Sequence, residues 1–173
     1  MGIARRHPWL SALVAVAIGA AATVPIVAYI ILPQFVRSTL VEDLPVPSVS
    51  AAPSTTSGAP APTTPAVDTL LKGELVRVSV ADYGSGIVRI VRVGDDRFLR
   101  FEDVDIAGAP DMYVYLSDRT DGKPGTFVDL GKLKATNGSF NYRIPASLDL
   151  GAVKSVVVWC RQFTVTVTYA ALR

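Results

Sequence analysis

The sequence predicts an all-β domain over residues 67–173, and within that class an antiparallel β-sandwich. Short apolar segments recur there about every 8–12 residues, and turn sequences rich in glycine, asparagine and aspartate separate them. No window of about ten residues after position 66 shows the apolar spacing of a helix. A stretch of this length suits a single sandwich domain.

The expected strands follow one another closely along this domain. They are residues 74–80, 87–93, 98–104, 112–116, 126–130, 140–144, 153–160 and 163–172. The expected turns are Gly84-Ser85-Gly86, Gly94-Asp95-Asp96, residues 122–125 and Asn137-Gly138, the last as a hairpin turn between two strands.

The last expected strand has the clearest pattern. Residues 163–169 read FTVTVTY, so apolar side chains alternate with threonine and one face of the strand packs against the core. If this register runs back without interruption, Trp159 shares the core face with Phe163, and Cys160 faces away from it. A bulge or turn at residues 161–162 reverses the arrangement, because one added residue flips every side chain. The uninterrupted register, with Cys160 on the non-core face, is the arrangement that we expect.

The N-terminal segment predicts a membrane anchor. Residues 7–36 carry no formal charge, and residues 9–36 are mostly Ala, Val, Ile and Leu. A helix needs about 20 apolar residues to span a bilayer, whereas the apolar region of a cleaved signal peptide has only about 7–15. We therefore expect a signal-anchor transmembrane helix over 9–36 whose partner is the lipid bilayer. Because Arg5 and Arg6 precede it, the positive-inside rule places residues 1–8 in the cytoplasm and the C-terminal domain outside the cell membrane, in the cell envelope.

A linker is expected at residues 37–66, between the anchor and the domain. Residues 45–65 contain six prolines and no charge, a composition that forms extended, partly polyproline chain rather than a packed core. Such a segment reaches roughly 65 Å. We interpret it as a spacer that holds the domain away from the membrane.

Composition excludes several functions. The formal net charge is only +2 and no basic stripe is present, so nucleic acid is not an expected partner. The only histidine is His7, which leaves the domain without a histidine for a catalytic pair or for haem ligation. A single cysteine excludes a disulfide framework and a multi-cysteine metal cage. We therefore assign no catalytic residue, metal ligand or required cofactor, and we expect that the chain is not an enzyme by itself.

The candidate site residues each have a functional and a structural interpretation. Cys160 is the one side chain with intrinsic redox chemistry, although a free cysteine is often a small buried hydrophobe. Asp103 and Asp111 lie in an acidic region that suits calcium oxygen ligands, yet the Asp-rich calcium loop is missing and Asp111 fits a turn after Pro110. Tyr83 and Trp159 could line a ligand groove, or they could pack across strands.

Five segments of the domain resemble a known family. They are 98–103 (FLRFED), 109–116 (APDMYVYL), 128–134 (VDLGKLK), 140–145 (FNYRIP) and 155–163 (SVVVWCRQF). In order and spacing they are similar to the DM-thirteen domain, an electron-transfer domain with a β-sandwich fold found outside membranes, and the resemblance covers residues 72–172. Its signature cysteine matches Cys160, and its Pro-Asp element matches Pro110-Asp111. The chain departs from the family at Ala109, usually glycine, and at residues 82–84, where the family often has a histidine.

Two functions follow from these observations. The resemblance implies a membrane-anchored accessory domain in electron transfer or redox chemistry, centred on Cys160 and working with a redox partner. The alternative is a non-enzymatic cell-envelope binding or interaction module with a structural cysteine. The role of Cys160 separates the two.

Overall fold

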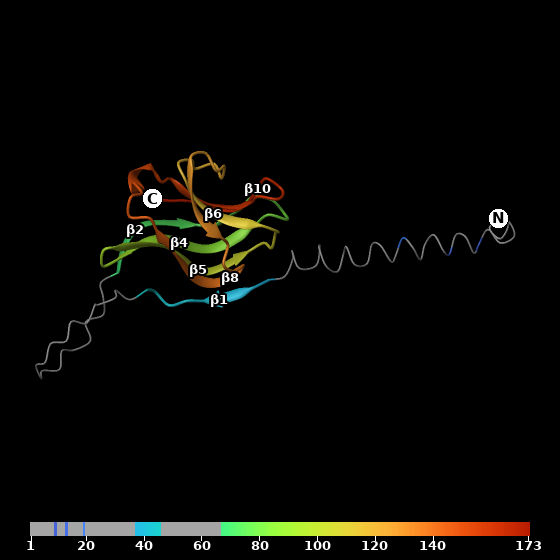
Figure 1. Ribbon diagram of the computed structural model, residues 1–173, viewed down its shortest axis with the longest axis horizontal. Helices are drawn as coiled ribbons and strands as arrows, with labels where there is room; N and C mark the ends of the chain where they lie inside the picture. Colours follow the sequence, from blue (N-terminus) through green and yellow to red (C-terminus); the bar gives the residue numbers. More distant parts are fainter. Residues whose placement is uncertain (1–8, 10–12, 14–18, 20–36, 46–66) are drawn as a thin grey trace, which may run out of the picture. The chain divides into compact units, whose positions relative to one another are not determined.

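The computed structural model describes Trp9, Leu13, Gly19 and residues 37–45 and 67–173 of the chain (Figure 1). The chain divides into two compact units, Met1–Val36 and Arg37–Arg173. In the first unit the three described residues are helical. The remainder of the predicted transmembrane helix lies outside the described residues, as does linker segment 46–66. Within the described part of the chain, no helix combines the length and the apolar character that crossing a bilayer demands.

The unit Arg37–Arg173 is built from two five-stranded sheets. The first sheet has the order β1 (Thr39–Val41), β8 (Asn137–Ile144), β5 (Asp96–Ile106), β4 (Gly84–Val93) and β2 (Val67–Glu74). The second has the order β3 (Val76–Arg77), β10 (Val165–Ala171), β9 (Ser155–Cys160), β6 (Met112–Ser117) and β7 (Phe127–Lys132). All pairings are antiparallel except that of β1 with β8. The prediction of an all-β domain with two largely antiparallel sheets is confirmed.

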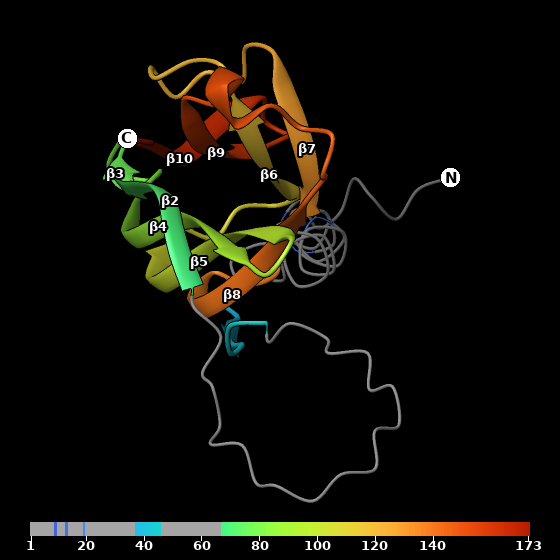
Figure 2. The same ribbon diagram turned by 90° about the vertical axis from the view of Figure 1, so that its left-hand side faces the viewer.

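The core lies between the two sheets, which Figure 2 shows as separate layers. Phe101 and Phe140 come from neighbouring strands, are fully buried, and stack with ring centroids 4.9 Å apart. The hydroxyl of Tyr142 accepts a hydrogen bond from the Lys134 N–H (2.8 Å) and donates one to the Lys132 carbonyl (3.1 Å). Burial raises the pKa of this phenol above its ordinary value. The aromatic cluster therefore joins β5 and β8 to the chain that leaves β7.

Part of the expected linker belongs to the sandwich. Thr39, Leu40 and Val41 form β1, which pairs with Asn137, Gly138 and Ser139 of β8. The prediction of a linker beginning at residue 37 is therefore wrong for residues 37–45. Since β1 and β2 are the two edges of one sheet, segment 46–66 starts and ends on the same domain. Four strand spacings separate these edges, roughly 19 Å, so this segment does not set the distance between residue 36 and the domain.

Two of the expected turns lie within strands, opposite a bulge of β5 near Asp103. Gly94-Asp95 does form the β4–β5 hairpin, with Val93 opposite Asp96. Residues 84–86, by contrast, lie in β4 at a register shift, where Gly86 has φ +105°. Asn137-Gly138 lies in β8 rather than in a hairpin, and Gly138 has φ +106° because the Leu40 carbonyl of β1 approaches it closely. The same glycine freedom serves a turn and a close backbone approach within a strand, so sequence alone does not separate them.

Candidate functional site

Cys160 is the last residue of β9 and lies in the core between the sheets. Its exposed fraction is 0%, and it packs in the same cluster as Val156 and Val158. The expectation that it faces away from the core is wrong. Residues 161–164 form the turn between β9 and β10, with Cys160 opposite Val165. The alternation therefore does not continue from β10 into β9, and the interrupted register is the correct one.

The thiol of Cys160 is engaged with the Pro-Asp element. Its Sγ donates a hydrogen bond to the carbonyl of Pro110 at 2.9 Å. The neighbouring Arg161 N–H donates to the carbonyl of Asp111 at 3.1 Å. These two bonds fasten the Pro110-Asp111 turn, where Asp111 has φ +51°, to the end of β9. A thiol that is buried and donates to a backbone carbonyl offers no sulfur surface to a partner disulfide, which a thiolate nucleophile has to reach in thiol exchange.

The guanidinium of Arg161 lies over aromatic rings and not beside the sulfur. Its Cζ is 3.4 Å from the ring centroid of Tyr113, and its Nε donates to the Tyr115 hydroxyl at 2.7 Å. It also pairs with Asp129 of β7. In this position the charge cannot stabilise a thiolate at Cys160, which is one of the conditions that make a cysteine reactive.

Trp159 lies on the opposite face of β9 from Cys160, at an apolar groove. The groove has a volume of about 490 Å³ and is lined by Val78, Trp159, Val165, Tyr169 and residues 121–124, among others. Two hydrogen bonds hold the long loop after β6 over this face, from Thr166 Oγ1 to Gly122 O (2.6 Å) and from Ser117 Oγ to Lys123 O (3.1 Å). The mostly apolar lining of this groove suits an apolar ligand or a partner's side chain.

The other predicted binding residues do not gather around Trp159. The ring of Tyr83 lies 4.9 Å from the guanidinium of Arg77, and its hydroxyl accepts from Arg37. Asp103 sits at a bulge of β5 with φ +48°, and its backbone N–H donates to Ser139 Oγ at 3.0 Å. Asp111 alone is brought next to Cys160, and its side chain lies 3.7 Å from Lys132 Nζ.

The acidic residues near Asp103 have basic or polar partners. Glu102 forms ion pairs with Arg89 (2.9 Å) and Arg100 (3.3 Å), although the buried Nε atoms of both arginines make no hydrogen bond. Asp105 pairs with Arg37 and accepts from Asn137 (3.2 Å). In the described ranges, no three His, Cys, Asp or Glu side chains cluster in a way that would hold a metal ion.

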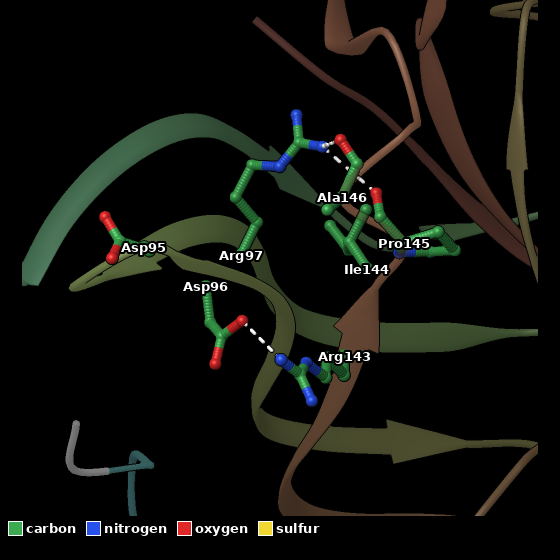
Figure 3. Close-up of a pocket in the computed structure, with 7 residues that line it drawn as sticks. All are labelled: Asp95, Asp96, Arg97, Arg143, Ile144, Pro145 and Ala146. Carbon is green, nitrogen blue, oxygen red and sulfur yellow. Dashed lines mark hydrogen bonds and ion pairs between the residues drawn. The ribbon is translucent and has the colours of Figure 1, made fainter. Parts of the chain in front are cut away.

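A second hollow lies at the far end of β5, beside the β4–β5 hairpin (Figure 3). Its volume is about 360 Å³. Arg97 donates to the carbonyls of Pro145 and Ala146 (3.0 and 2.8 Å), and Arg143 pairs with Asp96 at 2.6 Å. Three of the charged side chains that line this hollow, Asp96, Arg97 and Arg143, are thus bonded to each other or to backbone and serve the structure of the hairpin.

Fold and site together define a class of protein: a β-sandwich domain with one buried thiol, hydrogen-bonded to a Pro-Asp turn, and an apolar groove behind it. The sequence model of the family described as Electron transfer DM13 matches residues 77–172. The chain belongs to this family. No curated protein and no solved structure matches the chain.

The sequence did not identify the residues that other strands and loops contribute to the groove beside Trp159. Tyr169 and Val78 line the groove with Trp159, but Val78 was expected inside a strand and lies in the loop after β3. Arg161 was not among the candidate residues. It lies in the turn directly after β9, and the rings that its guanidinium contacts belong to Tyr113 and Tyr115 of β6.

Proposed function

We propose that the chain is a membrane-anchored accessory domain of an extracytoplasmic electron-transfer system that acts by binding a redox or cell-envelope partner. The family description supports a redox-related setting. The uncharged run of residues 7–36, preceded by Arg5 and Arg6, supports a single-pass anchor with the sandwich outside. The apolar groove at Trp159 supplies a surface for a partner.

In this proposal Cys160 is a structural thiol. The observation that carries it is the hydrogen bond from a fully buried Sγ to the Pro110 carbonyl. A sulfur in this position packs as a small apolar atom and satisfies a backbone acceptor. It presents no surface at which a partner's disulfide could be attacked.

A direct redox role for Cys160 is the second candidate. The position of the sulfur favours this role. Its Sγ contacts the Pro-Asp turn, and Arg161, the residue after Cys160, lies over the ring of Tyr113 nearby. For thiol exchange, that turn has to move away from the end of β9 and the thiol has to lose its proton.

Oxidised glutathione separates the two roles. The purified full chain, incubated with oxidised glutathione without denaturant, is expected to keep its mass, because Cys160 is fully buried and its sulfur cannot reach the disulfide. A chain with Asp95→Cys, at the exposed β4–β5 turn, is the matched control and should gain one glutathione. Glutathione on Cys160 in the native parent chain would overturn the structural assignment in favour of the redox one.

Membrane topology tests the rest of the proposal. Cells expressing the full chain with a C-terminal tag should retain it in membranes after alkaline carbonate extraction. Protease added outside intact cells or spheroplasts should remove the tagged domain. Release of the chain by carbonate, or protection of the tag in intact spheroplasts, would contradict the proposed anchor or its orientation.

A further inference from the structure

One end of the sandwich exposes three large apolar side chains. Val80 is 92% exposed, Phe163 is 56% exposed and Val78 is 47% exposed. Val78 and Val80 lie in the loop after β3, and Phe163 lies in the turn between β9 and β10. Val78 and Val165 line the same groove beside Trp159, so the loop and the turn are neighbours.

The loop after β3 is a defined projection. The backbone N–H groups of Val78 and Ser79 donate to the carbonyl of Asp82 (3.0 and 2.8 Å), and Ser79 Oγ donates to the Asp82 carboxylate (2.9 Å). Arg77 contacts the carbonyl oxygens of Ser79 and Val80 at 3.4 Å. These bonds satisfy most of the polar backbone of the tip, and they leave the Val80 side chain pointing outward.

The chain enters the sandwich at this same end. Arg37, the first residue of the unit, pairs with Asp105 near the end of β5 and donates to the Tyr83 hydroxyl at 3.4 Å. Tyr83 directly follows the loop that carries Val78 and Val80. Arg77, which leads into that loop, pairs with Thr168 of β10, the strand that begins directly after the turn at residues 161–164. Arg37 is also the first charged residue after thirty uncharged positions.

We propose that Val78, Val80 and Phe163 form a surface that docks on the bilayer next to the point where the chain emerges. This inference rests on the membrane anchor of the proposed function. If the apolar core of the bilayer ends near residue 36, the lipid interface lies within reach of side chains at the end of the sandwich that contains Arg37. Apolar side chains on an adjacent loop gain by entering that interface.

The charges around this surface are mixed in sign. Arg77 and Arg161 are accompanied by Asp82 and Asp129. A polybasic patch would indicate a preference for anionic lipid, and this end has none among the described residues. Docking is therefore expected on zwitterionic phosphatidylcholine, and the apolar side chains supply the binding free energy.

The test places an environment-sensitive probe on the full chain in phosphatidylcholine vesicles. Val80→Cys and Phe163→Cys are each labelled with the fluorophore NBD, and Asp95→Cys, at the far end of the sandwich, is the matched control. The unsubstituted chain, treated in parallel, reports any label on Cys160. At positions 80 and 163 the NBD emission should be shifted to the blue. It should also lose intensity when the vesicles contain lipid with a nitroxide quencher. At position 95 neither change is expected.

Each outcome bears on the inference. If the chain resists carbonate extraction while probes at 80 and 163 behave like the probe at 95, the docking surface is refuted and the anchor stands. If carbonate releases the chain and all three probes stay in water, both fail. Blue-shifted probes that the nitroxide lipid does not quench, and that respond to protein density, would show contact with protein and would also overturn the inference.

Discussion

Replacing Gly138 by alanine should remove β1 from the sandwich. Gly138 has φ +106°, and a Cβ placed on it would lie 2.1 Å from the carbonyl oxygen of Leu40 and 3.0 Å from the carbonyl carbon. Backbone atoms cannot yield as a flexible side chain would, so the strand that contains Leu40 has to move. Gly131 offers a matched control, since it has φ +105° and no atom within 4 Å of the added Cβ.

The two substitutions differ in expected cost. A side chain in the left-handed region costs roughly 1–2 kcal/mol, and this cost is common to both glycines. Gly138→Ala also loses hydrogen bonds between β1 and β8, such as Glu42 N–H to Ser139 O (2.7 Å) and Asn137 N–H to Ser38 O (2.9 Å). At about 1 kcal/mol for each bond, Gly138→Ala should lower the free energy of unfolding by about 2–3 kcal/mol more than Gly131→Ala.

Hydrogen exchange measured by mass spectrometry on the full chain is the assay. The peptide that covers residues 37–45 should exchange much faster in Gly138→Ala than in the parent chain, and at the parent rate in Gly131→Ala. Equal protection of residues 37–45 in the two variants would refute the close approach of β1 to Gly138.

Two further predictions concern Cys160 and Glu42. Cys160→Ala should lower the free energy of unfolding by about 2 kcal/mol, and Tm by roughly 6–10 °C, through the lost sulfur packing and hydrogen bond. Cys160→Ser should cost about half as much because its hydroxyl still donates to Pro110; melting curves unchanged in both would contradict a structural thiol. Partial burial acts to raise the pKa of Glu42, but hydrogen bonds from Lys134 and Asn141 outweigh it and lower the pKa below 4.5. A carboxyl whose pKa is lower in the folded than in the unfolded state stabilises the fold fully at pH values above its unfolded pKa. This contribution is lost as the pH falls through its pKa in the folded state. Glu42→Gln should therefore flatten the loss of Tm below about pH 4.5, and an unchanged acid slope would refute this role.

The strands of the sandwich were predictable where the pattern is local. Residues 87–93 and 98–104 are short apolar-rich segments, and the Gly94-Asp95 turn has a composition that favours the hairpin between them. β1 was not predictable, because three residues gain their strand conformation from Asn137–Ser139, almost a hundred positions later. Asn137-Gly138 permits positive φ equally in a turn and beside an approaching strand, and only the partner decides which one forms.

The candidate site was predictable in its residues and not in its orientation. Cys160 and the Pro110-Asp111 element were identified, but the alternation of residues 163–169 was extended back through a turn that carries no glycine or proline, and β10 itself shifts register between Thr166 and Thr168. Residues 161–164 interrupt the register, so Cys160 enters the core and Phe163 is exposed. The contact between Cys160 and Pro110 joins residues 50 positions apart, a distance over which sequence periodicity gives no information.

Cys160 places a buried thiol inside the sandwich, hydrogen-bonded to the Pro110 carbonyl. Infrared spectroscopy of the full chain measures this bond, because the S–H stretch of the single thiol absorbs where other protein groups do not. One narrow S–H band is expected, at lower wavenumber than in the unfolded chain, absent in Cys160→Ser and slow to exchange in D₂O. No S–H band in the native chain, or a band at the unfolded position that exchanges at once, would contradict the buried, hydrogen-bonded thiol.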